Sequence, residues 1–175
     1  MKFLLFYRFL FMSIAATVVL TGNAMQRVNT STRLVNLIDQ LGQSRDEYLF
    51  NMTKYQWSKT EYNRERHLQR KLRTKIIKLI EQYQYQPVLN HVGTLDDNTQ
   101  ITPLELAALY GDLIITKALL VNGVHPTWNA IHRTQEVCAR LEAKRLQHTE
   151  TYKTTTKCLA LLKQAERETK KRHDH

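Results

Sequence analysis

Residues 102–126 read TPLELAALYGDLIITKALLVNGVHP, and this stretch decides the fold class. Thr102 and Pro103 predict the start of a helix, because a threonine oxygen caps the first turn and proline needs no N–H there. Gly111 and Gly123 predict the ends of two short helices, since a residue with left-handed backbone is tolerated best when it is glycine. We therefore expect two short antiparallel helices that need neighbours on both sides to bury their apolar faces.

The same stretch resembles one repeat of the ankyrin family over residues 97–127. The residues that carry the resemblance are Asp97, Thr102-Pro103-Leu104, Leu106-Ala107-Ala108, Gly111, Ala118-Leu119-Leu120, Gly123 and Pro126. Two positions depart from the family pattern. Glu105 stands where a histidine is usual, and Val124-His125 replaces the usual small-acidic pair. The alternative is a chance Thr-Pro-Leu helix in an unrelated bundle.

The resemblance implies a non-catalytic protein that recognises a protein partner through its loop tips and inner helices. The residues expected to line this surface are Leu95, Asp97, Gln100, Glu105, Leu109, Tyr110, His125 and Trp128. Because one repeat does not fold alone, the flanking segments must act as divergent or capping repeats. Residues 93–127 are thus expected to be one unit of a short stack.

The flanks predict an all-α fold, with an N-terminal helical extension and a long C-terminal capping hairpin. The chain has only 5 Gly and 3 Pro, too few for a turn-rich β sandwich. Residues 25–43 predict a polar lead-in to residue 33 and a short helix ended by Gly42, and Ser44 with Glu47 predicts the capping box of a new helix. Residues 44–92 predict a basic helical segment, which is either one helix or two with a break near Ser58 and Thr60. Residues 93–101 predict a loop.

Downstream, residues 128–167 predict a helical hairpin with helices at about 128–147 and 152–165, followed by a charged tail at 168–175. Its two cysteines, Cys138 and Cys158, are the only ones in the chain. If the hairpin turns near His148, both lie about 15 Å along their helices and level with each other. Since exported proteins usually join such cysteines, we expect a disulfide; a redox pair and two buried thiols are the alternatives.

The first 24 residues predict a secretory signal peptide. Lys2 and Arg8 come before an apolar run from Phe9 to Leu20, and Thr21-Gly22-Asn23-Ala24 offers small residues for cleavage after Ala24. The alternative is a membrane anchor at residues 3–20, which would place Arg8 inside the span at an energetic cost. Either interpretation exports the domain, to the periplasm or the outside of the cell.

Positive charge is concentrated in the segment before the repeat. The chain carries 26 Lys and Arg against 16 Asp and Glu, a formal net charge of +10. The predicted basic face consists of Lys54, Lys59, Arg64, Arg66, Arg70, Lys71, Arg73, Lys75 and Lys78. Such a face attracts acidic lipid, acidic protein or nucleic acid, and export makes nucleic acid the least favoured partner. Attachment to an anionic surface, with the repeat as scaffold, is therefore the alternative function.

No motif in the sequence indicates catalysis or a bound cofactor. The seven histidines show no metal-ligand spacing on a helix, and we interpret the His173-Asp174-His175 tail as solvated. The sequence has no glycine-rich phosphate loop and no Gly-x-Ser-x-Gly element. We therefore predict a protein that is not an enzyme and that needs neither metal nor cofactor.

Overall fold

The computed structural model describes residues 27, 29–46 and 59–173, which are mostly helical. Residues 29–46 form a helix that we call helix 29–46. The further helices are α2 (Lys59–Gln82), α3 (Pro103–Leu109), α4 (Leu113–Val121), α5 (Trp128–Ala143) and α6 (Glu150–His173), with one 3-10 turn, η1 (Pro87–Asn90). Two short strands, β1 (Gly93–Thr94) and β2 (Gln100–Ile101), pair antiparallel. The predicted all-α class is confirmed.

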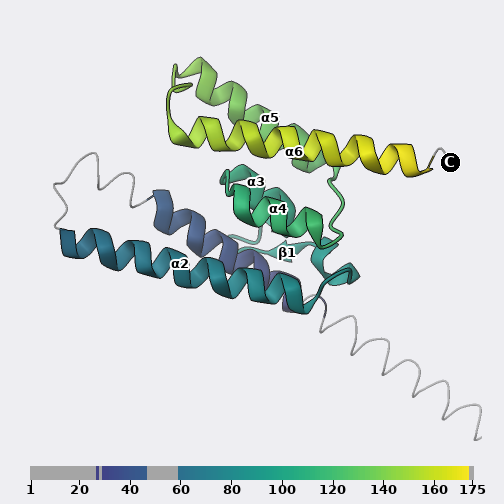
Figure 1. Cartoon of the computed structure of the whole chain (residues 1–175), viewed down its shortest axis with the longest axis horizontal. Helices are drawn as coiled ribbons and strands as arrows, with labels where there is room; N and C mark the ends of the chain where they lie inside the picture. Colours follow the sequence, from purple (N-terminus) through teal and green to yellow (C-terminus); the bar gives the residue numbers. More distant parts are fainter. Residues whose placement is uncertain (1–26, 28, 47–58, 174–175) are drawn as a thin grey trace, which may run out of the picture.

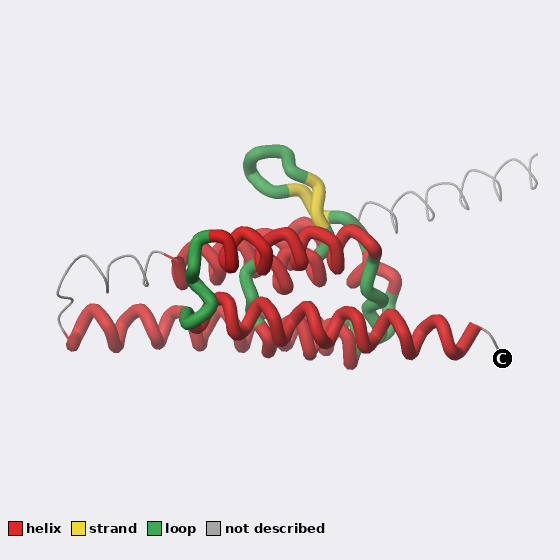
Figure 2. The backbone as a smooth tube through the Cα atoms, turned by 90° about the horizontal axis from the view of Figure 1, so that it is seen from above, coloured by secondary structure: helices red, strands yellow, loops and turns green. Residues whose placement is uncertain are grey.

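The helices pair into three stacked layers (Figure 1). Helix 29–46 and α2 form the first layer, α3 and α4 the second, and α5 and α6 the third. α3 packs on α5, and α4 packs on both α2 and α6. The β1–β2 hairpin joins the first layer to the second and projects from one edge of the stack (Figure 2). The second layer is therefore covered on two sides.

One hydrophobic core runs through all three layers. Every residue of α3 from Pro103 to Ala108 is buried, although this helix has only seven residues. A helix this short is marginal in water, so its stability comes from the layers on either side. The most deeply buried large apolar side chains are Leu34, Ile38, Ile76, Ile80, Leu89, Leu104, Ile115, Leu119 and Leu162.

The second layer has the caps and turns that its sequence predicts. Thr102 Oγ1 accepts a hydrogen bond from Glu105 N at 3.2 Å, and Pro103 is the first helical residue. Gly111 and Gly123 have φ of +64° and +86°, as expected of residues that end helices. α4 also has the predicted bounds. Residues 93–101, predicted as a loop, contain in addition the β1–β2 hairpin.

The first layer differs from its prediction at three places. Residues 29–33, expected as a loose lead-in, are helical, and Gly42 is buried inside helix 29–46 and does not end it. A Cβ on Gly42 would lie 2.4 Å from the Tyr110 ring, so the glycine allows close packing against the second layer. Ser44 is not an N-cap, because it lies within the helix and its hydroxyl donates to Glu65 Oε1 of α2. Glu47 lies outside the described residues.

α2 is described from Lys59 and ends at Gln82, before the predicted Gln86. The place of the possible break near Ser58 and Thr60 falls at the edge of the described residues, so one helix and two remain alternatives. Tyr85, in the turn that follows, has a φ of 58°, and its N–H donates to Asn122 O at 3.0 Å. This bond ties the end of the first layer to the end of α4. The left-handed backbone at Tyr85 carries a steric cost that the surrounding contacts must offset.

The third layer has the predicted helical hairpin, with different bounds. α5 ends at Ala143, before Gln147, and α6 runs well past Ala165 to His173. Most of the predicted charged tail is therefore helical, which corrects that prediction. Side-chain pairs four residues apart support this end of α6, including Lys170 Nζ to Glu166 Oε1 at 2.9 Å.

Within the described ranges, no helix is long and apolar enough to cross a membrane. The predicted signal peptide or anchor, residues 1–24, lies outside these ranges.

Candidate binding surfaces

The predicted partner-binding residues fall into two groups, of which the first is open to solvent. Asp97 and Gln100 are exposed on the β1–β2 hairpin, and Leu95 is half-buried at its base. The hairpin tip is held by its own hydrogen bonds, including Thr99 N to Asp97 Oδ1 at 2.9 Å. This bond lowers the pKa of Asp97, so the tip carries a negative charge at neutral pH. The hairpin is thus an ordered acidic projection.

His125 and Trp128 belong to a second open segment, the turn between α4 and α5. The backbone N–H of His125 donates to Asn90 Oδ1 at 3.1 Å, and Asn90 lies just before β1. The turn and the base of the hairpin are therefore tied together. Trp128 is 69% exposed and stacks on His132 of the same helix, with ring centroids 4.5 Å apart. We call this turn with the hairpin tip the hairpin–Trp128 edge.

Glu105 and Tyr110 are not on an open surface, which corrects the prediction for both. Glu105 is 5% exposed and forms an ion pair with Arg133 of α5, Oε1 to Nη1 at 3.0 Å. The Tyr110 hydroxyl donates to Asp39 Oδ1 at 2.6 Å, and burial together with this carboxylate raises the pKa of Tyr110 well above its usual value. Leu109 is half-buried against the core. The physical reason is that α3 lies between helix 29–46 and α5.

The predicted basic face separates into paired and unpaired residues. Arg73 reaches the second layer, where its Nη2 lies 2.9 Å from Asp112 Oδ2. Asp112 also caps α4 by accepting from Ile115 N at 3.1 Å, so Arg73 holds two layers together and does not belong to an open face. Arg66 donates to the Tyr62 hydroxyl at 3.1 Å on another side of α2. Lys54 lies outside the described residues, and so does the side chain of Lys59.

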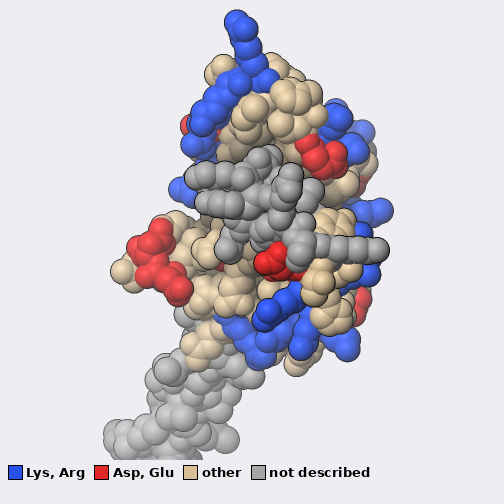
Figure 3. All heavy atoms as spheres, turned by 90° about the vertical axis from the view of Figure 1, so that its left-hand side faces the viewer, with Lys and Arg blue, Asp and Glu red and all other residues tan. Residues whose placement is uncertain are grey.

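The remaining five bases are exposed and form what we call the α2 cationic face. They are Arg64, Arg70, Lys71, Lys75 and Lys78. None of them forms an ion pair with any residue that the structure describes. Four of the five line an open hollow of about 590 Å³ on α2, together with His67 and Thr74. In Figure 3, basic side chains gather along the lower side of the molecule, where α2 lies in Figure 1.

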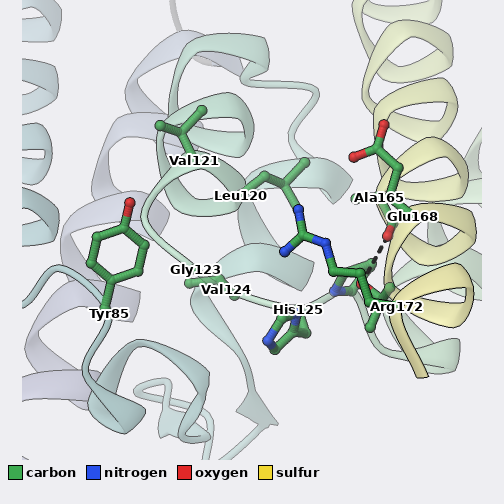
Figure 4. Close-up of a pocket in the computed structure, with 11 residues that line it drawn as sticks. Tyr85, Leu120, Val121, Gly123, Val124, His125, Ala165, Glu168 and Arg172 are labelled. Carbon is green, nitrogen blue, oxygen red and sulfur yellow. Dashed lines mark hydrogen bonds between the residues drawn. The ribbon is translucent and has the colours of Figure 1, made fainter. Parts of the chain in front are cut away.

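A separate half-open pocket of about 250 Å³ lies where α4 ends (Figure 4). Tyr85, Leu120 and His125 line it, and Arg172 reaches into it from α6. Carbonyl groups at the C-terminus of a helix favour positive charge, which the Arg172 guanidinium supplies. The pocket lining has no nucleophile paired with a general base. Within the described ranges, no three His, Cys, Asp or Glu side chains are grouped to hold a metal ion.

Cys138 and Cys158 are free and buried thiols, so the predicted disulfide is wrong. The turn between α5 and α6 spans residues 144–149 and is centred before His148, so the two cysteines are offset by about 4.5 Å along their helices. Cys138 Sγ faces Thr156 Oγ1 at 3.9 Å, while Cys158 Sγ accepts from Thr116 Oγ1 of α4 at 3.6 Å. Burial raises the pKa of Cys158 to about 11.

No protein-family model, curated protein or solved structure matches this chain. Among the described residues, the hairpin–Trp128 edge and the α2 cationic face are the two candidate surfaces on which exposed side chains from the predicted sets gather. Sequence reasoning found members of both. It missed that Arg73 and Glu105 are interlayer contacts, because their partners Asp112 and Arg133 are distant in the sequence.

Proposed function

We propose that the protein is a non-catalytic binding module, an ankyrin-like stack of helical hairpins that recognises a protein partner through the hairpin–Trp128 edge. In this proposal the chain acts after export, as its N-terminal segment predicts. Paired helices in layers, with a hairpin projecting between two of them, support the ankyrin-like interpretation. The turns at Gly111 and Gly123 support it as well, because they lie at the positions that carry the resemblance.

The observation that carries the proposal is the exposure of Trp128. Tryptophan is enriched among the residues that dominate protein–protein binding energies, and Trp128 is 69% exposed beside the ordered hairpin. The ring stacks on His132, so little side-chain freedom remains to be lost on binding. Thr127 Oγ1 caps the same turn by accepting from Ala130 N at 3.1 Å, which fixes the backbone beneath the ring.

Site-specific photo-crosslinking tests this function. A photoreactive phenylalanine analogue placed at Trp128 in the full chain, expressed in its native host, should give a discrete crosslinked product. The matched control is the same analogue at Ile114, an apolar residue of α4 that is 52% exposed. If the hairpin–Trp128 edge binds the partner, a crosslinked product should form at position 128 and none at position 114. Equal products at both positions, or none at 128, would contradict the proposal.

A binding measurement follows once the crosslinked partner is identified. Trp128→Ala should weaken binding by about tenfold or more, the usual effect of truncating a dominant interface residue. Ile114→Ala should change it by less than about twofold, because it lies away from the edge. Both side chains are exposed, so neither change should unfold the protein, and circular dichroism checks this.

A further inference from the structure

We propose that the α2 cationic face attaches the protein to a membrane surface rich in acidic phospholipids. This face lies on the first layer and shares no residue with the hairpin–Trp128 edge. The inference therefore does not depend on the proposed protein partner. It rests on three observations: charges that have no ion-pair partner among the described residues, a row of side chains along one helix, and an exposed leucine within that row.

The first observation is that, among the described residues, the bases with a structural role form ion pairs and these five do not. Arg73 and Arg133 form ion pairs with the buried carboxylates of Asp112 and Glu105. Glu65 is on another side of α2, where it accepts a hydrogen bond from Ser44. Glu61 and Glu81 are exposed and lie at the two ends of the face, three residues before Arg64 and three after Lys78. The five bases outnumber these two acids, so the face keeps an excess of positive charge that attracts an anionic partner.

The second observation is the shape of this face. Arg64, Lys71, Lys75 and Lys78 recur at the spacing of one helical face, over about 21 Å of helix. This face is opposite the buried Ile76 and Ile80, which pack into the core. All the residues that line the hollow belong to α2, so no other element of the described structure encloses it. A straight cationic row without walls fits a flat anionic surface better than it fits a folded peptide.

The third observation is Leu68, which is 44% exposed and lies in the same row, four residues after Arg64 and three before Lys71. An apolar side chain among cations suits the boundary between lipid headgroups and acyl chains. A single-stranded nucleic acid would favour aromatic rings that stack on its bases, and the hollow has no Phe, Tyr or Trp in its lining. A nucleic-acid duplex is bound through its phosphates by basic side chains alone, and Leu68 is the feature of this row that favours lipid over a duplex.

Vesicle sedimentation with the full chain tests the proposal. Vesicles of phosphatidylcholine alone are compared with vesicles that also contain about 30% phosphatidylserine. The chain should bind the acidic vesicles more tightly, and raising the salt concentration should remove the difference because it screens exposed charges. Binding to neutral vesicles reports any contribution from the apolar residues 3–20. Equal binding to both kinds of vesicle would overturn the proposal.

Two triple variants that each remove three positive charges test which surface of the protein binds the acidic vesicles. Lys71→Gln/Lys75→Gln/Lys78→Gln removes three charges from the cationic face, and Lys153→Gln/Lys157→Gln/Lys163→Gln removes three exposed charges from α6. Since each base near an acidic membrane contributes about fivefold, the first variant should lose about 100-fold in acidic-vesicle binding and the second only a few-fold. Equal losses would show that net charge alone is responsible and would overturn the proposal.

Leu68→Gln separates a lipid surface from other polyanions, because it changes no charge. It should weaken acidic-vesicle binding several-fold and leave binding to a DNA duplex unchanged. Unchanged vesicle binding by this variant, or tighter binding to the duplex than to acidic vesicles at the same salt concentration, would overturn a lipid partner. Circular dichroism of each variant confirms that α2 is intact.

Discussion

The second layer of the stack is shaped by its own turns, whereas the first layer is shaped by what packs against it. In the α3–α4 layer, Thr102 and Asp112 cap the helices and Gly111 supplies the left-handed turn. In the first layer, Gly42 makes room for the Tyr110 ring from within a helix. The difference teaches that two glycines in one small protein can be required for different reasons. Gly42 is required for space alone, whereas Gly111 combines a left-handed backbone with close packing, because its Cβ would lie 2.7 Å from Thr155 Oγ1 of α6.

The largest expected effect is the loss of unfolding free energy when a core side chain is truncated, which should be greater in the middle layer than in an end layer. Leu119→Ala, in the middle layer, should lower the free energy of unfolding by about 3–5 kcal/mol, because the cavity lies between two neighbouring layers. Ile80→Ala, in the end layer, should cost less, about 2–3 kcal/mol. Both side chains are fully buried, so the pair is matched in exposure. Urea unfolding followed by circular dichroism gives both values, and an equal or larger cost at Ile80 would break the comparison.

The two glycines provide the next prediction. Gly42→Ala should cost about 1–3 kcal/mol, because the added methyl overlaps the Tyr110 ring. In a Tyr110→Ala background the same change should become stabilising by about 0.5–1 kcal/mol, since alanine is the better helix former.

Gly111→Ala is the counterpart in the second layer. Its φ of +64° alone costs about 1–2 kcal/mol, and the added methyl would also lie 2.7 Å from Thr155 Oγ1 of α6. Neither cost involves the Tyr110 ring, so both should persist in the Tyr110→Ala background. Thermal and urea unfolding of the single and double variants measure the coupling. If Gly42→Ala is as costly without the Tyr110 ring as with it, contact is not the reason for that glycine.

The Tyr110–Asp39 hydrogen bond joins the two layers and gives a smaller, pH-dependent effect. Tyr110→Phe should cost about 1–2 kcal/mol at neutral pH, because Asp39 Oδ1 loses this donor while Oδ2 keeps its hydrogen bond from Gln43. The folded protein raises the pKa of Tyr110 above the ordinary value of 10.0, so this hydroxyl ionises first in the unfolded chain. Its contribution is complete below pH 10 and is lost as the pH rises beyond it. The difference in melting temperature between wild type and Tyr110→Phe should therefore shrink above pH 10; a constant difference would contradict this.

Short-range rules made the second layer predictable from sequence. Thr102, Pro103, Gly111 and Gly123 each act within a few residues, and the bounds of α4 follow from them. By the same rules Gly42 should end a helix and Ser44 should cap one. Both lie inside helix 29–46 instead, and their roles depend on contacts with Tyr110 and Glu65. The sequence alone does not distinguish a glycine that ends a helix from a glycine that makes room for an aromatic ring. Only the residue that packs against the glycine distinguishes the two.

The candidate surfaces were predictable to a similar extent. Exposed residues such as Asp97 and Trp128 could be placed, because the turns that hold them are local. Glu105 and Arg73 could not, since their ion pairs span layers and depend on how the layers stack. The same holds for Cys138 and Cys158, because an offset of a few residues in the α5–α6 turn decides whether the two thiols can meet.

The smallest effect tests whether the caps themselves are local. Thr102 Oγ1 and Thr127 Oγ1 each accept a hydrogen bond from the backbone N–H three residues on, at 3.2 and 3.1 Å. Thr102→Ala should cost about 1 kcal/mol, and Thr127→Ala about 0.5 kcal/mol, because Thr127 is exposed and water replaces the lost oxygen there. Serine at either position should restore most of the loss, whereas valine, which keeps the shape without the acceptor, should not. If valine at Thr102 is as stable as serine in urea unfolding, then packing between the layers, and not the cap, fixes the start of α3.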